Sequence, residues 1–369
     1  MATNFISLRE LEQLAQMKLD SNAFQYYRSG ANEEITKKQN LDAFQKIYLN
    51  PRVLRDVSKI CTKTKILGHD IDLPIGLAPV AMLKLAHPLG EEVTASQAHL
   101  WKVPFTLTTL STLSQSEVAR HNKDGLRFQQ LYIQKNRSLT EALVRKAEKE
   151  GFKGLVLTVD APILGKREAD EKQRFVLPPH LKLEILEELA KEANIQLQSV
   201  ANNQGSGLLK FFAEQLDQTV NWNDIKWLRS ITKIPIILKG IQCGEDAKLA
   251  VQHGVDAIWV SNHGGRQLDT VRATIDMLPE IVAAAAGQLE VYVDSGIRNG
   301  TDVYKCLALG AKCVFVGRPA IYSTAIGGKE GLNKMFQILQ SELISTMQLM
   351  GVTSIQEIKC DGIVPKAKL

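Results

Sequence analysis

Residues 234–262 read IPIILKGIQCGEDAKLAVQHGVDAIWVSN, and this stretch decides the fold. Two short apolar runs, 234–240 and 257–262, each predict a buried strand. Residues 245–253, between them, have the pattern of a helix. A strand, a helix and a strand in this order favour two parallel strands that are joined by a helical crossover.

The same alternation continues in both directions along the chain. Helical patterns at 138–150 and 300–309 separate further apolar runs. Eight units of strand and helix predict an α/β fold in the form of a closed (β/α)8 barrel. The eight predicted strands are residues 74–79, 104–109, 127–133, 154–160, 234–240, 257–262, 290–296 and 313–319.

The rest of the chain fits around one barrel, so we expect residues 1–369 to form a single domain. Residues 1–70 precede the barrel as helices and a hairpin-like stretch, and residues 1–20 have an amphipathic helical pattern rather than that of a signal peptide. Residues 161–221 form one long, charged and irregular connection, which predicts a lid over a functional site.

The composition narrows the class of ligand. The chain has 369 residues, 44% of them hydrophobic, and a net charge of +5 without a basic block. This composition predicts a globular core and favours a small anionic ligand over nucleic acid or a membrane. The five cysteines form no CxxC pair, so we expect reduced thiols, mostly in the core, and no bound metal.

The chain ends in Ala367, Lys368 and Leu369. This tripeptide differs from the peroxisomal address Ser-Lys-Leu only by Ala in place of Ser. A chance tripeptide on a frayed tail is the alternative. We expect a peroxisomal location, and a cytoplasmic one if the tail is no address.

The run 257–262 ends in His263, two glycines and Arg266 instead of ordinary turn residues. Active sites of barrels lie at the carboxyl ends of the strands, where this histidine is expected. A histidine titrates near neutral pH and suits a general base, and an arginine grips a carboxylate with two hydrogen bonds. Asp160, at another strand end, would hold the charged imidazole, and Arg167 would supply a second clamp. A structural histidine is the alternative.

The last two predicted strands are followed by DSGIR, residues 294–298, and GRP, residues 317–319. Barrels often bind phosphate at this place, through glycine amides and a helix N-terminus. Arg298 and Arg318 add donors that suit phosphate oxygens, although ordinary turn glycines with surface arginines would look the same. Lys239 is the one charge of its strand, so it either faces a ligand or reaches out to solvent.

Several motifs together resemble one family. They are SNHGGRQLD (261–269), TVDAPILGKREAD (158–170), ILKG (237–240), DSGIR and VFVGRP (314–319). Over residues 7–350 the chain is similar to the FMN-dependent α-hydroxy acid oxidases and dehydrogenases, which include glycolate oxidase, lactate oxidase and flavocytochrome b2. The resemblance implies FMN, a homotetramer and oxidation of a small L-2-hydroxy acid to the 2-oxo acid. Hydride transfer and a carbanion route both stay open.

The resemblance also implies residue roles. His263 resembles the base and Asp160 its electrostatic partner, with Arg167 and Arg266 as clamps of the substrate carboxylate. Tyr26 resembles a carboxylate ligand, Tyr132 the hydroxyl that contacts the substrate oxygen, and Lys239 the cation beside the flavin. The other residues that it implies to contact FMN are Ala78, Pro79, Ala81, Thr108, Gln130, Thr158, Ser261, Asp294, Gly296, Arg298, Gly317 and Arg318.

Four positions depart from the glycolate-oxidase pattern. Leu110 stands where plant glycolate oxidases carry Trp, and Phe212 falls near a position that is small and aliphatic there; together they resemble lactate-preferring oxidases. We therefore expect L-lactate to be preferred to glycolate, although both residues could be lid packing without effect on substrate choice. Val80 replaces a Thr without expected consequence. Asn299 replaces an Arg that is common after Arg298, and this change weakens the argument that the protein must be an oxidase.

Other functions stay open beside an oxidase that reduces O2 to H2O2. They are a dehydrogenase with another acceptor and an oxidase that prefers glycolate or a longer hydroxy acid. An FMN-barrel isomerase would have no use for two carboxylate clamps beside His263. A flavoprotein without catalysis would not need the full set of catalytic residues. The isomerase and the non-catalytic flavoprotein therefore rank below the oxidase.

Overall fold

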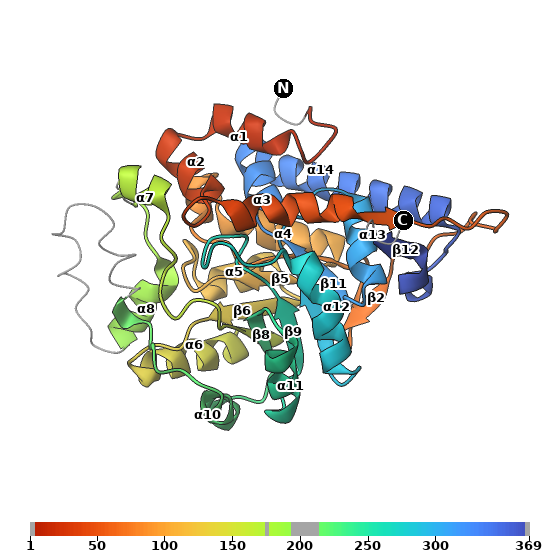
Figure 1. Ribbon diagram of the computed structural model, residues 1–369. Helices are drawn as coiled ribbons and strands as arrows, with labels where there is room; N and C mark the ends of the chain where they lie inside the picture. Colours follow the sequence, from red (N-terminus) through yellow and green to blue (C-terminus); the bar gives the residue numbers. More distant parts are fainter. Residues whose placement is uncertain (1–3, 174–176, 193–213, 366–369) are drawn as a thin grey trace.

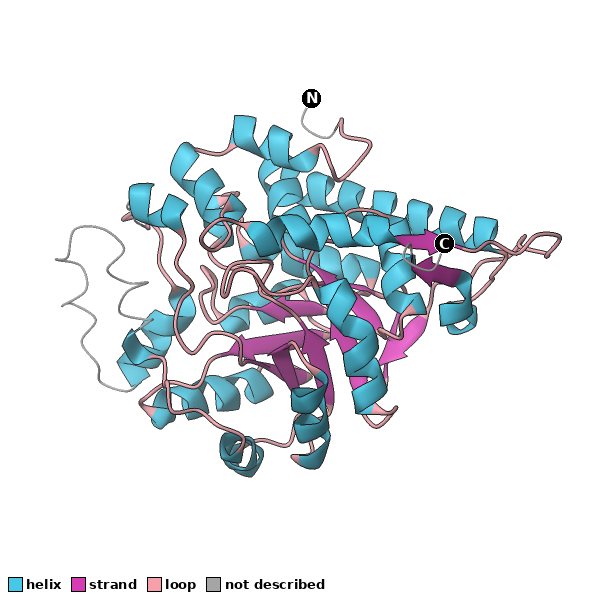
Figure 2. Cartoon of the chain, in the orientation of Figure 1, coloured by secondary structure: helices cyan, strands magenta, loops and turns pink. Residues whose placement is uncertain are grey.

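A closed barrel of eight parallel strands forms the centre of the computed structural model, which describes residues 4–173, 177–192 and 214–365. Consecutive strands pair in order around the barrel, and the last strand pairs with the first to close it (Figures 1 and 2). The predicted α/β barrel and all eight predicted strands are confirmed. The strands are β4 (Ile75–Leu77), β5 (Phe105–Leu107), β6 (Arg127–Leu131), β7 (Gly154–Thr158), β8 (Ile236–Ile241), β9 (Ala257–Val260), β10 (Glu290–Val293) and β11 (Cys313–Val316).

Helices connect successive strands and cover the outside of the barrel (Figure 2). Side-chain caps start several of them: Ser114 and Glu117 form a capping box, and Asn136 and Asn299 each accept a hydrogen bond from a first-turn amide. The last helix is interrupted at Gly327 and Gly328, which have non-helical backbone angles. The helices are α4 (Glu91–Trp101), α5 (Gln115–His121), α6 (Arg137–Lys149), α10 (Asn223–Ile231), α11 (Gly244–Gln252), α12 (Thr274–Ala285), α13 (Gly300–Ala308) and α14 (Arg318–Met350).

Large aromatic side chains fill the inside of the barrel. Trp259, Tyr292 and Phe315 are buried there with Phe128, and the ring centroids of Trp259 and Phe315 lie 3.9 Å apart. Lys239 lies over the indole ring, with its ammonium 5.8 Å from the ring centroid. The packed interior therefore supports a polar layer at the carboxyl ends of the strands instead of leaving a pore.

Residues before the barrel form helices and a hairpin, as expected. They comprise α1 (Leu11–Lys18), α2 (Ser21–Arg28), α3 (Ile35–Asp42), β1 (Ile47–Leu49), β2 (Thr64–Ile66) and β3 (His69–Ile71), with β1 paired to β12 (Ile363–Pro365). The helix expected at 1–20 is shorter: α1 begins only at Leu11 and ends at Lys18. Asp20 then accepts hydrogen bonds from two amides of α2 and so starts a second helix. Helix α1 packs against α14 (Figure 1), and this places α2 and α3 beside the carboxyl ends of the strands.

The connection 161–221 is more regular than expected where it is described. It contains α7 (Glu168–Gln173) and α8 (Glu184–Glu192), and α8 packs against α6. Ile185 and Leu189 are buried, and Glu188 forms an ion pair with Lys146. Alternating charged and apolar residues at helical spacing explain this second helix, which the expectation of an irregular loop missed.

Some predictions fall outside the described residues or are only partly met. Phe212 and the tripeptide 367–369 lie outside the described ranges, and the tetramer also stays a prediction. All five cysteines are free, but only Cys306 and Cys313 are buried, so the expectation that most are core residues is wrong. Within the described ranges, no helix is long and apolar enough to cross a membrane, and no three His, Cys, Asp or Glu side chains form a metal site.

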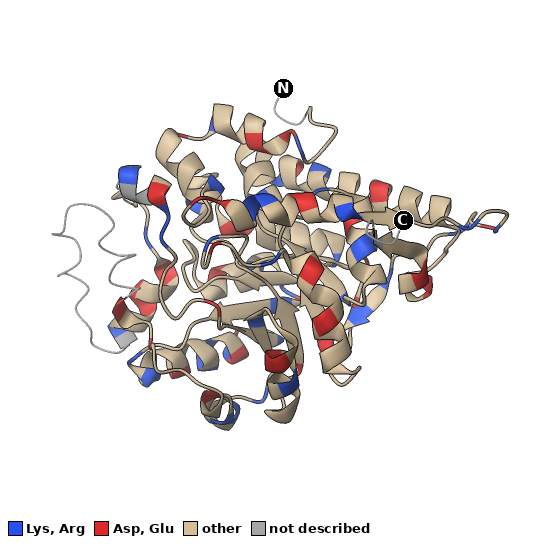
Figure 3. Cartoon of the chain, in the orientation of Figure 1, with Lys and Arg blue, Asp and Glu red and all other residues tan. Residues whose placement is uncertain are grey.

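Basic and acidic residues are interspersed along the helices (Figure 3). Several basic residues, among them Lys239, Arg298 and Arg318, line a cavity at the carboxyl ends of the barrel strands. This distribution agrees with the expectation of a small anionic ligand.

Candidate functional site

A cavity of about 760 Å³ opens at the carboxyl ends of the barrel strands. Side chains from the strand ends, from α2 and α3 and from the start of α14 line it. Asp160 and Ser261 were also predicted for the site; they do not line the cavity but contact residues that do. The predicted residues that line it are Tyr26, Ala78, Pro79, Ala81, Thr108, Leu110, Gln130, Tyr132, Thr158, Arg167, Lys239, His263, Arg266, Asp294, Gly296, Arg298, Gly317 and Arg318.

His263 and Asp160 form a hydrogen-bonded pair at the wall of this cavity. His263 Nδ1 lies 2.9 Å from Asp160 Oδ1, and the aspartate side chain is only 2% exposed. Ser261 and Asn262 separate His263 from the end of β9. His263 adopts φ +58°, and its amide donates to Ser261 Oγ at 3.1 Å. An ionised Asp160 favours the tautomer with hydrogen on Nδ1, which leaves the lone pair of Nε2 to accept a proton.

Burial and nearby charges set the protonation of this pair. Burial lowers the pKa of His263, and Lys239 and Arg167 lower it further, although Asp160 opposes them. Burial alone would raise the pKa of Asp160, but the charges of His263 and Lys239 outweigh it and hold that pKa below its usual range. The pair therefore consists of a neutral imidazole and a carboxylate at neutral pH, the state that a general base requires.

Two arginines and two tyrosines line the same cavity as the histidine. Arg266 Nη1 donates to the carbonyls of Tyr26 at 2.7 Å and Ser29 at 2.9 Å, and its guanidinium lies over the Tyr26 ring, 5.2 Å from the centroid. Arg167 Nε donates to the carbonyl of Arg266 at 3.4 Å. Burial raises the pKa of Tyr132, so its phenol stays a neutral donor. These groups together suit a carboxylate and an adjacent oxygen atom.

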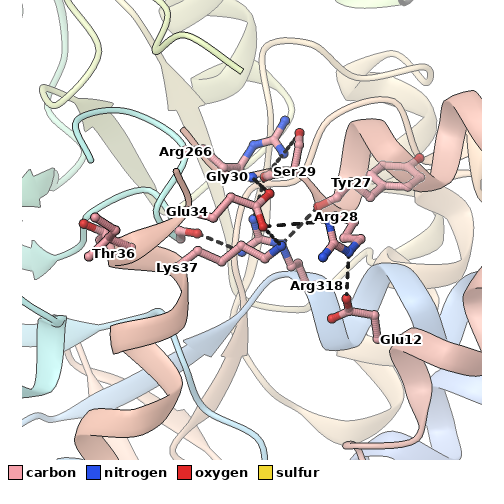
Figure 4. Close-up of polar contacts among 12 residues, drawn as sticks. Glu12, Tyr27, Arg28, Ser29, Gly30, Glu34, Thr36, Lys37, Arg266 and Arg318 are labelled. Atoms are coloured by element: carbon pink, nitrogen blue, oxygen red, sulfur yellow. Dashed lines mark hydrogen bonds and ion pairs between the residues drawn. The ribbon is translucent and has the colours of Figure 1, made fainter. Parts of the chain in front are cut away.

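Arg318 is held by the end of helix α2. Its Nε donates to the carbonyl of Tyr27 at 3.0 Å, its Nη1 to Gly264 at 2.8 Å and its Nη2 to Ser29 at 2.9 Å. Arg266 donates to the same Ser29 carbonyl, so one backbone oxygen orients both arginines (Figure 4). This role of Ser29 could not be predicted from the sequence, because the acceptor is a backbone carbonyl that any residue carries.

A chain of ion pairs adjoins Arg318 at the edge of the cavity (Figure 4). Lys37 Nζ lies 2.7 Å from Glu34 Oε2, and the other Glu34 oxygen accepts from the amide of Gly30 at 2.7 Å. Arg28 links Glu34 to Glu12, through contacts of 3.7 Å and 3.2 Å. Sequence reasoning missed these residues, whose charges pair along and between α1, α2 and α3.

Three side chains of the motif RQLD, residues 266–269, form hydrogen bonds that connect the histidine loop to three other segments. Arg266 holds the end of α2, as described above. Gln267 Nε2 donates to the carbonyl of Asp160 at 3.1 Å, and Asp269 Oδ1 accepts from the amide of Thr36 at 2.8 Å in the first turn of α3. Arg266 is the one residue of this motif whose role was predicted from the sequence. Gln267 and Asp269 explain why the rest of the motif accompanies it.

Polar side chains continue around the rim of the barrel. Lys239 is 3% exposed; its Nζ donates to Ser261 Oγ at 3.0 Å and lies 3.7 Å from Asp294 Oδ2. Gln130 Nε2 donates to Thr158 Oγ1 at 3.1 Å, so neighbouring strand ends are bridged. The lysine therefore does not reach out to solvent, and the structure favours the alternative in which it faces a ligand.

Residues 15–365 match the model of the family described as FMN-dependent dehydrogenase. The chain belongs to this family. It is 48% identical to glycolate oxidase 1 of Zea mays over 361 residues, which are 98% of this chain and 96% of the relative. It is 47% identical to the glycolate oxidase of Spinacia oleracea, over 95% of this chain and 94% of the relative.

Solved structures of family members agree with the fold. A Pediococcus acidilactici protein described as a lactate oxidase is 34% identical, with a TM-score of 0.91 over 99% of this chain and 96% of its own. A mandelate oxidase is 36% identical, with a TM-score of 0.86 over 96% of this chain and 97% of its own. Membership of the family establishes FMN as the cofactor.

The residues of the cavity fit FMN. Arg298 and Arg318 are two partly buried cations beside the first turn of α14, where a dianionic phosphate would be stabilised. Burial lowers the pKa of both, and that of Arg318 falls to about 10. Gly317 leaves room for close approach, since an added Cβ would lie 3.6 Å from its nearest neighbour, Val80. Lys239 and Gln130 offer donors to a polar ring edge.

Proposed function

We propose that this FMN-dependent 2-hydroxy acid oxidase prefers L-lactate to glycolate and passes its electrons to O2, with H2O2 as product. The observation that carries the preference is Leu110, a buried side chain that lines the same cavity as His263 and Arg266. A leucine offers an apolar contact for the methyl group of lactate, and glycolate has no such group to place there.

The proposed roles follow from the geometry around the histidine. Arg266 and Arg167 bind the substrate carboxylate, and the hydroxyls of Tyr26 and Tyr132 contribute further hydrogen bonds. His263 accepts a substrate proton at Nε2, and Asp160 stabilises the imidazolium that results, through the 2.9 Å contact to Nδ1. Bound FMN supplies the two-electron chemistry.

Glycolate is the competing substrate, because the curated relatives at 47–48% identity are glycolate oxidases. The lactate proposal rests on Leu110 within the described residues, since Phe212 lies outside them. A single methyl group changes the preference by only about 1–3 kcal/mol. Both acids are therefore expected to react, at different rates.

The test is stopped-flow reduction of the bound flavin. The holoenzyme is mixed without oxygen with L-lactate, glycolate or D-lactate, and the visible absorbance of FMN is followed; air is then admitted and H2O2 is measured. We expect L-lactate to bleach the flavin fastest and air to restore it rapidly. Faster bleaching by glycolate would refute the preference, and slow recovery in air would indicate an acceptor other than O2.

The role of His263 is tested in the same experiment. His263→Ala should retain FMN and its absorbance spectrum but lose flavin reduction, by about 10²–10⁴-fold. His253→Ala is the control, because His253 ends α11 outside the cavity and should leave the rate unchanged. Reduction of His263→Ala at the native rate would exclude the histidine as the base.

A further inference from the structure

Two loops that line the cavity follow the paired strands β4 and β5. The first loop, residues 78–90, leads to α4 and contributes residues 78–81 to the cavity wall. The second loop, residues 108–114, leads to α5 and contributes Thr108 and Leu110. The other residues of both loops do not line the cavity, so the position of this wall depends on the contacts that hold them.

Glu91 connects the two loops through one buried carboxylate. It is the first residue of α4, it is 1% exposed and it does not line the cavity. Its Oε1 accepts from the amide of Leu83 in the first loop and from the amide of Thr112 in the second, both at 3.1 Å. Its Oε2 accepts from the hydroxyl of Thr112. A single side chain therefore forms hydrogen bonds with both loops.

Further hydrogen bonds join the same two loops. The amide of Met82 donates to the carbonyl of Leu110 at 3.3 Å, and the amide of Lys84 donates to Thr112 Oγ1 at 3.2 Å. Met82 has φ +61°, which is uncommon for a residue other than glycine, and its carbonyl accepts from the hydroxyl of Tyr27 at 2.8 Å. The backbone of the cavity residue Leu110 is therefore held against the first loop.

The donors that satisfy the Glu91 carboxylate are two amides and a hydroxyl, all of them neutral. Burial raises the pKa of Glu91, and the hydrogen bonds from Thr112 and Leu83 oppose this effect. Removal of the carboxylate would leave buried donors in both loops without an acceptor, which is more unfavourable than the loss of an average hydrogen bond. The two loops would therefore have to rearrange in order to satisfy these donors.

We propose that Glu91 is a positioning residue for substrate selection, which holds the loop of Leu110 against the loop that follows β4. It acts through Leu110, whose side chain lines the cavity, and its own side chain lies outside the cavity lining. The inference rests on the role of Leu110 in the proposed function. It extends the control of substrate preference to a residue behind the cavity wall.

Two variants of Glu91 test the proposal in the holoenzyme. The measured quantity is the ratio of kcat/KM for L-lactate to that for glycolate. Glu91→Ala should lower this ratio about 10-fold, because a displaced Leu110 no longer contacts the methyl group of lactate. Glu91→Gln should keep the native ratio, since its carbonyl oxygen can accept from both amides and its NH2 group can donate to Thr112 Oγ1.

The visible circular dichroism of bound FMN gives a second readout. It should change in Glu91→Ala and stay native in Glu91→Gln, because residues 78–81 line the cofactor cavity. Thr112→Val provides the measurement if Glu91→Ala does not fold. It removes the hydroxyl that donates to Glu91 and keeps the amide that does so, and it should shift the ratio in the same direction by a smaller factor.

Glu117→Ala is the matched control. Glu117 also accepts hydrogen bonds at the start of a helix, from the amide of Ser114 at 2.8 Å, but it does not line the cavity and its bonds lie within one loop. This variant should keep the native ratio and the native dichroism.

An unchanged ratio in Glu91→Ala and in Thr112→Val, with both acids slowed equally, would overturn the proposal. A ratio in Glu91→Gln as altered as that in Glu91→Ala would also overturn it, because the hydrogen bonds would then not be the cause. A wild type that prefers glycolate would refute the lactate preference alone, since the positioning role is measured by the change in the ratio between wild type and variant.

Discussion

Gly240 lies directly against Asp160, the partner of the histidine. A Cβ atom at residue 240 would lie 2.6 Å from Asp160 Cβ and 2.7 Å from its Cγ, closer than real side chains approach. Gly240 has φ +107°, at an irregularity in the pairing of β8 with β9 between Lys239 and Ile241. The glycine of ILKG is therefore a packing requirement for the orientation of Asp160, a consequence that the motif alone does not show.

We predict that Gly240→Ala displaces Asp160 and slows flavin reduction by about 10²-fold, because small misplacements of catalytic groups have effects of this size. FMN should still bind. Gly254→Ala is the control, since Gly254 also has positive φ (+67°) but no atom within 4 Å of the added Cβ. Both variants should lose some thermal stability, and only Gly240→Ala should lose its rate. Equal rates in the two would show that the contact does not orient Asp160.

The pH dependence of reduction should reveal the charge of Asp160. Reduction requires neutral His263, so kcat/KM should fall as the pH decreases through the lowered pKa of this histidine, below its ordinary range. Asp160 raises the pKa of His263, and Asp160→Asn removes that influence. The acid limb should therefore move to still lower pH while the maximum rate falls by about 10²–10⁴-fold. Stopped-flow reduction is followed between about pH 4 and pH 9, a range that covers the titration of carboxyl and imidazole groups. It measures both the position of the acid limb and the maximum rate. An acid limb that stays in place would exclude the coupling.

The features that the sequence predicts are those with a periodic or chemical signature. The β-branched runs before Asp160, Lys239 and His263 locate strands, and polar residues at their ends locate the rim of the cavity. The contacts of Ser29 have no such signature, because Ser29 orients Arg266 and Arg318 through its backbone carbonyl.

Arg266→Lys should weaken substrate binding while FMN remains bound. Arg266 donates to two carbonyls of α2 and lies over the Tyr26 ring, and a lysine cannot keep that orientation while it holds a carboxylate. We expect KM for L-lactate to rise about 10-fold to 150-fold, as for loss of one hydrogen bond to a charged group.

Arg272→Lys is the control for this prediction. It makes the same change in an exposed arginine that pairs with Glu280 at 2.9 Å, outside the cavity. The steady-state kcat and KM of this variant for L-lactate should equal those of the wild type. A normal KM for Arg266→Lys would remove the residue from the proposed carboxylate site.

Leu110→Trp should shift the preference from L-lactate towards glycolate. Leu110 is 9% exposed and lines the cavity, so a larger ring has to occupy space that the proposal assigns to the methyl group of lactate. The ratio of kcat/KM for lactate to that for glycolate should fall by about 10-fold to 200-fold, the range for one methyl group in an apolar pocket. Leu268→Trp, at a residue that is 68% exposed and outside the cavity, should keep the native ratio. If Leu110→Trp loses activity with both acids equally, Leu110 maintains packing and the lactate preference loses the residue on which it rests.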